Sequence, residues 1–390
     1  MMKNPHFKET NKILIEDKEV TDILVYKLKN VSNAFYFACL IYRKNIQIFK
    51  YGYETKSFKN IGKIDVISSY FRSMKYFYNP LDKKEYFFII NDIDEIEIYL
   101  IKNENNFELI QKFNYINDED NNNNNNNNIL NIDDIDNIDN DSDSVGGGDP
   151  FTTFNFLGIF YDENDKNVYV IISYLIMQNA GADSSLDFYK SKSNNIFTFK
   201  DGKLNLIKTF KFDIDFNMNI LIYEKNDFNK KYLIDAHENN NLILTEIKSN
   251  YDNYEIENLF HDDNNKNELS NFIRSQRYYD SFFIYGKNNF DYLYIFEANK
   301  LMIINFTEKS VDNIIDFNQN YLRNMNNWNN NYIIFFQYGG KIDIYDTNNN
   351  KIIKEYKKKD CRDFISHSFP GKDETLGIFK YYDKIECYFA

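Results

Sequence analysis

The sequence predicts an all-β protein built from small antiparallel sheets, and three observations support this prediction. A unit of short strands joined by tight turns recurs along the 390 residues. No stretch of useful length places apolar residues at helical spacing. The last copy of the unit is one strand short, whereas the chain begins with a spare strand.

The repeating unit is clearest at 331–356. An apolar run is broken by Gly339-Gly340, and 341–346 then alternates polar and apolar residues, as expected of a strand with one buried and one wet face. An Asn-rich turn leads to a third strand at 351–356. Gly (13) and Pro (4) are scarce, so we expect the turns to depend on Asn and Asp. The unit reads as an antiparallel meander.

Each copy of the unit pairs an apolar run with an alternating strand. The copies lie at 35–49, 85–99, 168–199, 231–245, 292–304, 332–346 and 375–389. Most recur about every 40–60 residues, the period of a four-stranded propeller blade. Further strands precede and follow several copies, such as 73–77 and 107–110 around the second. We therefore predict a seven-bladed β-propeller of four-stranded antiparallel blades.

The N-terminal strand is predicted to close the ring. The seventh copy ends at Ala390 without an outer strand, and 12–16 can supply one by pairing into the last blade. Closure would hide sheet edges that otherwise promote aggregation. On this prediction 12–390 is a single propeller domain and 1–11 is a flexible N-terminus. The alternative is a pair of independent sheet domains.

The chain resembles the WD40-repeat β-propeller superfamily in the period and pattern of its units. Ile344-Tyr345-Asp346 stands where that family has a Trp-Asp ending. The sequence departs from the family's pattern because its one Trp, Trp328, precedes the middle strand and no Gly-His pair opens a unit. The resemblance implies a WD40-like interaction scaffold. It carries none of the family's Asp-His-Ser-Trp network over to residues here.

Two insertions interrupt the units. The segment 117–150 holds an eight-Asn run and Asp-rich alternations, a composition that cannot bury enough apolar surface to fold, so we predict a disordered Asn/Asp-rich loop between blades 2 and 3. Asp139, Asp141 and Asp143 resemble the start of a calcium loop, but the required Gly and Glu are missing. The smaller insertion, 178–193, is predicted to enlarge a turn inside the third blade.

Composition limits the compartment and the partners. A net charge of −13 argues against nucleic acid or an anionic membrane as the main partner. Cys39, Cys361 and Cys387 form neither a disulfide framework nor a metal spacing, which favours a reducing compartment. The chain shows no apolar signal core, and its most apolar stretch is too short for a membrane helix. We therefore expect a soluble, cytoplasmic protein, with the nucleus as an alternative.

No motif predicts catalysis or a cofactor. The four histidines have no metal spacing, and no phosphate loop, nucleophile elbow or Cys-x-x-Cys is present. We predict a non-enzymatic scaffold that needs no cofactor. Two alternatives stay open. A propeller hydrolase or lyase would gather carboxylates with raised pKa at one channel mouth. A structural subunit of a larger complex would show an extended apolar outer face.

Arginine is rare in the chain, and most of it stands just before a predicted innermost strand. These residues are Arg72, Arg277, Arg323 and Arg362. Equivalent positions on successive blades surround one mouth of a propeller channel, so the guanidinium groups would form a cationic ring. Arg makes bidentate bonds to carboxylate and phosphate. We predict that the mouth binds a protein partner through an acidic or phosphorylated segment. The alternative is that Arg is merely tolerated at wet strand ends.

Overall fold

The fold is all-β, as predicted. The computed structural model describes residues 8–14, 20–41, 45–55, 57–65, 71–91, 95–114, 151–162, 165–179, 187–212, 221–225, 230–237, 241–247, 254–258, 264, 283–287, 292–297, 300–305, 307–316, 322–328, 331–337, 339–368, 375–381 and 384–389. Its regular elements are the strands β1 to β28. Within these residues, none of the helices has the length and apolar character to span a bilayer.

Consecutive strands form four-stranded antiparallel sheets. The first two comprise β2 (Val20–Tyr26), β3 (Ala34–Ile41), β4 (Asn45–Gly52) and β5 (Ser57–Asp65), and then β6 (Phe71–Asn79), β7 (Lys84–Asn91), β8 (Glu95–Asn103) and β9 (Asn106–Asn114). The next two comprise β10 (Phe151–Asp162), β11 (Asn167–Asn179), β12 (Asp187–Lys200) and β13 (Lys203–Phe212), and then β14 (Leu221–Lys225), β15 (Lys230–His237), β16 (Asn241–Ile247) and β17 (Tyr254–Asn258).

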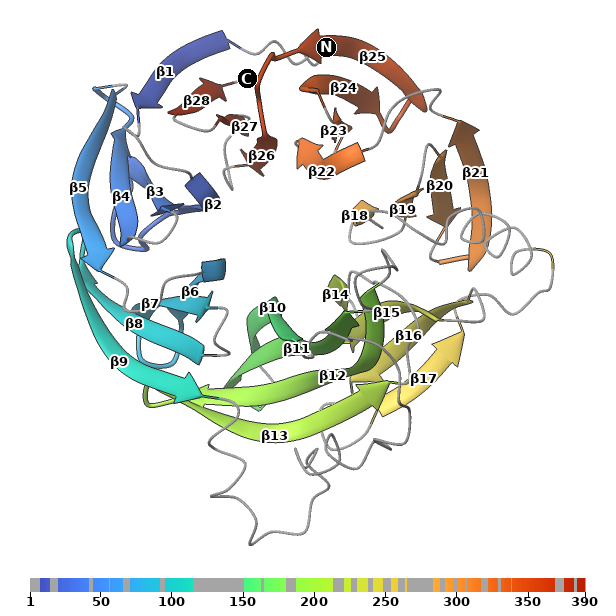
Figure 1. Cartoon of the computed structure of the whole chain (residues 1–390), viewed down its shortest axis with the longest axis horizontal. Helices are drawn as coiled ribbons and strands as arrows, with labels where there is room; N and C mark the ends of the chain where they lie inside the picture. Colours follow the sequence, from blue (N-terminus) through green and yellow to red (C-terminus); the bar gives the residue numbers. More distant parts are fainter. Residues whose placement is uncertain are drawn as a thin grey trace, which may run out of the picture.

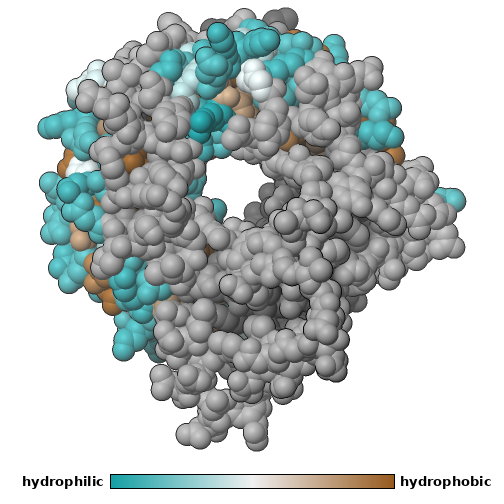
Figure 2. Space-filling model, in the orientation of Figure 1, coloured by the Kyte–Doolittle hydropathy of each residue, from teal (hydrophilic) through white to brown (hydrophobic). Residues whose placement is uncertain are grey.

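The remaining sheets follow the same order. They comprise β18 (Phe283–Lys287), β19 (Tyr292–Glu297), β20 (Lys300–Asn305) and β21 (Ser310–Asp316), then β22 (Leu322–Trp328), β23 (Tyr332–Gln337), β24 (Lys341–Asp346) and β25 (Lys351–Lys357), and finally β26 (Asp363–Ser368), β27 (Thr375–Lys380) and β28 (Lys384–Phe389), joined by β1 (Lys8–Leu14). Figure 1 shows the sheets following one another around a centre, with the first strand of each sheet innermost except in the last, where β26 is innermost and β1 outermost. Figure 2 shows that the molecule is hollowed through this centre. This is the arrangement of a β-propeller.

The strand β1 is the outer strand of the last sheet. It pairs antiparallel with β28 from Lys8↔Phe389 to Leu14↔Lys384. The predicted partner is therefore correct, but the strand begins four residues before the predicted 12–16. Residues 8–11 belong to this strand and not to the flexible N-terminus predicted for 1–11, because β28 offers a ladder that continues to Phe389. Residues 1–7 lie outside the described residues.

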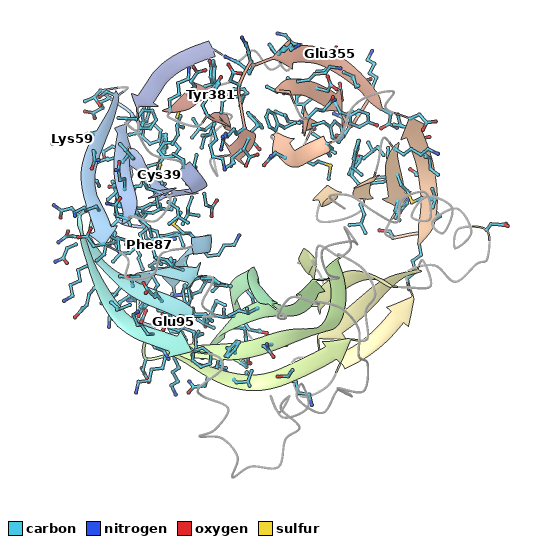
Figure 3. All side chains as sticks on the ribbon, in the orientation of Figure 1. Cys39, Lys59, Phe87, Glu95, Glu355 and Tyr381 are labelled. Carbon is cyan, nitrogen blue, oxygen red and sulfur yellow. The ribbon has the colours of Figure 1, made fainter. Side chains whose placement is uncertain are left out.

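The core lies between neighbouring sheets. One cluster joins the β2–β5 and β6–β9 sheets through residues such as Tyr36 and Phe87. Others join β6–β9 to β10–β13, the β26–β28 strands to β2–β5, and β22–β25 to the sheets on both of its sides. In Figure 3, Phe87 and Cys39 lie among the strands, whereas Lys59 is on the outer side. Every residue of β3 and of β23 is buried. Burial on both faces explains why these second strands read as continuous apolar runs.

The third strands are more deeply buried than their alternating sequence predicts. The expected wet face of 341–346 is covered, and Asp343 has no exposed surface. The prediction of one wet face is wrong here because a neighbouring sheet covers each side of the strand. Polar side chains are therefore enclosed between sheets and require partners.

A β-bulge recurs where the third strand meets the outer strand. The extra outer-strand residue is Ile61, Ile110, Ile207, Asp312, Ile353 and, in β1, Thr10. Ile61, Ile110 and Ile353 pack against the buried clusters. Because β1 carries its bulge at the same place, it repeats the geometry of the other outer strands.

The tight turns use Asp and Asn side chains as predicted, with an unexpected residue beside them. Asp82 Oδ1 accepts the N–H of Lys84 at 3.0 Å, and Asp165 Oδ1 accepts the N–H of Asn167 at 3.0 Å. The residue with left-handed backbone in both turns is a lysine, Lys83 (φ 59°) in the first turn. The Asp side chain therefore organises the turn, while its neighbour takes the less favourable backbone conformation.

Neither insertion adds an enlarged turn to the described chain. The segment 117–150, including the three Asp residues of the calcium-like pattern, lies outside the described residues. Most of 178–193 is strand, because β11 and β12 stay paired as far as Asn179↔Asp187. The paired strands thus take up part of the segment predicted as a turn, and the rest of it, 180–186, lies outside the described residues.

Candidate functional site: the channel mouth

The predicted arginines mark the beginnings of innermost strands. The strands β2, β6 and β22 each start with a bulge, and the extra residue is Thr21, Arg72 or Arg323. Arg362 directly precedes β26, and its N–H donates to the carbonyl oxygen of Lys380 at 2.7 Å. Arg72 and Arg323 thus lie within their strands and not just before them, as the sequence had suggested. Arg277 lies outside the described residues.

The backbone places these positions at one end of neighbouring sheets. The innermost strands β22 and β26 contact each other, and Asn326 Nδ2 joins them by donating to the carbonyl oxygen of Phe364 at 2.7 Å. The strand β2 likewise contacts β6. Arg323, Arg362 and Arg72 therefore occupy equivalent places around the same mouth, with Thr21 between the last two.

A short local pattern produces this strand start. The mouth residue is followed by a small polar residue and then by an apolar one, in Thr21-Asp22-Ile23, Arg72-Ser73-Met74, Arg323-Asn324-Met325 and Arg362-Asp363-Phe364. Asp22 Oδ1 accepts the N–H of Ile23 at 2.8 Å, and Asp363 Oδ1 accepts the N–H of Phe364 at 2.8 Å. A side chain that binds its own backbone competes with the ladder and favours a bulge. This pattern is visible in the sequence. The bulge that it favours, however, also depends on how the innermost strand pairs with the second strand of its sheet.

The mouth also contains charges that the sequence analysis missed. Lys380 at the end of β27 has its Nζ 3.6 Å from Asp363 Oδ2. Burial raises the pKa of Asp22, while the Ile23 N–H and the charges of Lys380 and Lys75 oppose that rise. Lys75, on β6, is exposed. In the part of the mouth that the structure describes, two lysines thus lie near two carboxylates.

These charges bear on the enzyme alternative. That alternative predicts clustered carboxylates with raised pKa at one mouth, and Asp22 does have a raised pKa. Its charged neighbours are the lysines Lys380 and Lys75. Within the described ranges, no three His, Cys, Asp or Glu side chains come together as a possible metal site.

A second set of polar residues lies one residue before the outer-strand bulge in five of the six sheets that carry it, whereas β20 has Met302 at this position. It comprises Gln47, Glu97, Asn195, Asp343 and Glu386. Glu97 and Asp343 have no exposed surface, and each meets a lysine: Lys112 Nζ lies 3.1 Å from Glu97 Oε1, and Lys341 Nζ lies 3.3 Å from Asp343 Oδ1. Both carboxylates therefore bind a lysine of their own sheet and are structural.

The densest of these networks surrounds Glu386 in β28. Its carboxylate accepts from Lys384 Nζ at 2.9 Å, from Tyr388 Oη at 2.9 Å and from Tyr381 Oη at 3.0 Å. Burial would raise the pKa of Glu386, but these three donors lower it to about 2. Lys358 Nζ, from the segment after β25, lies 3.6 Å away. These contacts therefore link β28 of the last sheet to the segment between β25 and β26.

The outer edges bear on the structural-subunit alternative. Among the described residues, the large exposed apolar side chains are Leu81, Leu109 and Ile314, of which only the last two lie on outer strands. Exposed lysines such as Lys59 on β5 and Lys351 on β25 stand along these edges. Charged edge residues discourage further strand pairing. This part of the chain therefore lacks the extended apolar outer face which that alternative requires.

Comparison with known proteins agrees on the fold. No family model matches the sequence, and no curated protein sequence matches it. In contrast, 1299 chains of solved structures match. The AfRom2 CNH domain is similar over 97% of this chain and 99% of its own, with a TM-score of 0.54 and 10% identity. BBS1N, solved in complex with ARL6DN, is similar over 98% of this chain and 96% of its own, with a TM-score of 0.56 and 9% identity.

Both of these structures are β-propellers, so the chain has a β-propeller fold. Identities this low show the fold alone. The WD40 resemblance stays a prediction.

Proposed function

We propose that this chain is a non-catalytic protein-interaction scaffold. It would be a single seven-bladed, WD40-like propeller whose ring β1 closes, and it would bind a protein partner at the mouth that carries Arg72, Arg323 and Arg362. The observation that carries the proposal is the equivalent placement of these arginines at the starts of innermost strands. The complex of BBS1N with ARL6DN supports a protein partner in general terms.

The chemistry of the mouth favours an acidic or phosphorylated segment. The chain as a whole carries a net charge of −13, so cationic groups at one mouth stand out against an acidic background. Asp22 and Asp363 already neutralise part of this charge, which leaves recognition to the geometry of the guanidinium groups. Bidentate Arg–carboxylate bonds provide such geometry, whereas a simple cationic surface would not.

The proposed scaffold would work in a reducing compartment, the cytoplasm or the nucleus. Cys39, Cys361 and Cys387 are buried and form no disulfide. Free thiols are kept reduced in these compartments.

The double variant Arg72→Ala/Arg323→Ala tests the proposal. A bead-bound peptide of Asp and Glu residues should retain the wild-type protein and release this variant. The matched control is Lys59→Ala/Lys351→Ala, which removes two exposed charges from the outer edge and should be retained. If the arginine variant is retained as well as wild type, the mouth is not the binding site.

A further inference from the structure

A cationic segment connects the β22–β25 sheet to the last sheet on the side of the mouth. Residues 357–362, named here the strip, lead from the end of β25 to the start of β26 and hold four cationic residues and one acidic one. The N–H of Lys358 donates to the carbonyl oxygen of Gly340 at 2.8 Å, in the hairpin between β23 and β24. The innermost strand β22 starts at this same end, since Leu322 pairs with Gln337. The strip therefore lies on the face that carries the mouth.

Backbone hydrogen bonds hold the strip against both sheets. At its inner end the N–H of Arg362 donates to the carbonyl oxygen of Lys380 at 2.7 Å, in the last sheet. Within the strip the N–H of Cys361 donates to the carbonyl oxygen of Lys358 at 3.2 Å. A Cβ on Gly340 would stand 1.9 Å from that same oxygen, so the strip lies directly on the hairpin. A surface with a fixed backbone loses little conformational entropy when it binds a ligand.

One carboxylate beside the strip serves two ammonium groups. Lys384 Nζ lies 2.9 Å from Glu386 Oε1, and Lys358 Nζ lies 3.6 Å from Glu386 Oε2. Burial would raise the pKa of Glu386, but its donors lower it to about 2, so this carboxylate is ionised at neutral pH. The three groups together therefore carry one net positive charge. The side chains of Lys358 and Lys384 are 28% and 29% exposed, so solvent reaches that charge.

Aromatic rings position these ammonium groups. Lys358 Nζ lies 5.2 Å from the ring centroid of Phe379 and 4.3 Å from that of Tyr388. Lys384 Nζ lies 4.4 Å from the ring centroid of Tyr381. A ring attracts a cation through its quadrupole and leaves the net charge unchanged. The excess positive charge is therefore held in a defined place and is available to an anion.

Exposed lysines extend this charge to the outer edge. Lys357 and Lys359 are exposed, as is Asp360, the acidic residue of the strip. Lys357 pairs across the sheet with Lys341, and like charges directly opposite each other are unfavourable. Glu355 offsets part of this repulsion, because its Oε2 lies 3.3 Å from Lys341 Nζ. In a chain with a net charge of −13, the strip is thus a cationic surface that an acidic ligand would complement.

We infer that the strip holds the continuation of the acidic partner segment that the mouth binds. The inference rests on the proposed function and specifies the course and the length of the partner. A four-stranded sheet measures about 14 Å from its innermost to its outer strand, which an extended segment crosses with about four residues. Arg362 stands at the mouth end of this course and Lys357 at its outer end. An acidic segment of about ten residues therefore fits the mouth and the strip together.

Exposed lysines on the outer strands allow a matched test. Lys357→Glu/Lys359→Glu reverses two exposed charges of the strip, whereas Lys59→Glu/Lys351→Glu reverses two near the opposite ends of β5 and β25. The two variants have the same net charge. The probes are fluorescein-labelled peptides of ten and of four Asp and Glu residues. They are titrated with intact protein at one fixed salt concentration and followed by anisotropy, because screening alters such contacts.

We expect Lys357→Glu/Lys359→Glu to weaken binding of the ten-residue peptide about tenfold by charge repulsion, and Lys59→Glu/Lys351→Glu to bind it as wild type does. Lys357→Arg/Lys359→Arg keeps the charge and should also bind as wild type does. Equal losses in the two charge-reversal variants would show an effect of net charge alone and overturn the inference. The absence of a loss in both would overturn it too.

The short peptide and the arginine variant separate this inference from the proposed function. The four-residue peptide should bind wild type more weakly than the ten-residue peptide does. It should bind Lys357→Glu/Lys359→Glu as well as wild type, and Arg72→Ala/Arg323→Ala should release it. If both peptides are lost in the arginine variant and neither responds to the strip variant, the strip is wrong and the mouth stands.

Other outcomes decide between further possibilities. If the ten-residue peptide responds to the strip variant but not to the arginine variant, the mouth is wrong and the strip alone binds the segment. If neither peptide binds wild type, both proposals fail. If an oligonucleotide of equal charge binds as tightly as the ten-residue peptide and responds to the same variants, the strip binds any polyanion and the inference is wrong.

Discussion

Asp343 and Glu386 occupy the same position in neighbouring sheets, yet their pKa values shift in opposite directions. Each lies one residue before the outer-strand bulge. Burial raises the pKa of Asp343, and Lys341 opposes this only in part. Burial acts on Glu386 in the same sense, but hydrogen bonds from Lys384, Tyr388 and Tyr381 prevail and lower its pKa to about 2. The number of donors therefore decides the sign of the shift.

Glu386→Gln should destabilise the protein at neutral pH. The pKa of Glu386 is lowered from 4.5 to about 2, so the charged form stabilises the fold above about pH 4.5 and this contribution is lost as the pH falls toward 2. The shift corresponds to about 3 kcal/mol. Denaturant unfolding of wild type and variant should differ by this order at pH 7 and converge near pH 2. The exposed pair Lys63–Asp65 provides the control, because Asp65→Asn should cost at most about 1 kcal/mol.

Asp343→Asn should behave in the opposite way. A raised carboxyl pKa gives a stabilising contribution below the unfolded value of 3.8 that is lost as the pH rises. Asparagine keeps an oxygen that can accept from Gln337 Nε2 and carries no buried charge. We expect the variant to be no less stable than wild type at pH 7 and relatively less stable near pH 3. A clear loss of stability at pH 7 would show that the Lys341 pair outweighs burial.

Gly340→Ala should be far more damaging than Gly339→Ala. Both residues have positive φ, of 75° and 81°, so alanine is strained at either position. A Cβ on Gly340 would stand 1.9 Å from the carbonyl oxygen of Lys358, whereas one on Gly339 would meet nothing within 4 Å. We expect Gly339→Ala to cost about 1–2 kcal/mol, the left-handed penalty alone. Thermal unfolding should show a loss at least about twice as large for Gly340→Ala, and equal losses would contradict the close approach.

Removal of residues 1–14 should leave the edge of β28 unpaired. The expected results are a lower melting temperature and concentration-dependent aggregation, because a free strand edge is a template for pairing. Removal of residues 1–7 serves as the control, since β1 starts at Lys8. Calorimetry compares the melting temperatures of the two truncated proteins, and light scattering compares their aggregation. If the two behave alike, β1 adds nothing to the last sheet.

The repeat could be predicted from the sequence because its cause is local. Runs such as 332–336 are apolar since both faces of β23 are buried, and that pattern is visible without any knowledge of neighbours. The burial of Asp343 could not be predicted in the same way. Its partner Gln337 is nearby in the sequence, but the sheet that covers it is not.

The mouth was predictable only in outline. The spacing of arginines ahead of apolar strands predicted positions just before innermost strands, which Arg362 has, whereas Arg72 and Arg323 lie within β6 and β22. Their bulges depend on the register with a second strand, and the pairing of Lys380 with Asp363 depends on the hairpin. The proximity of Lys380 to Asp22 joins opposite ends of the sequence. No local pattern contains that information.

The pairing of β1 with β28 has a consequence for biosynthesis. The ribosome makes β1 before the other strands described here and β28 after them, so β1 must wait while the intervening chain is translated. Contacts between such distant segments form late and slow the completion of folding. Until Phe389 has emerged, β1 is an unpartnered strand, and this nascent interval is when a chaperone would have most to protect.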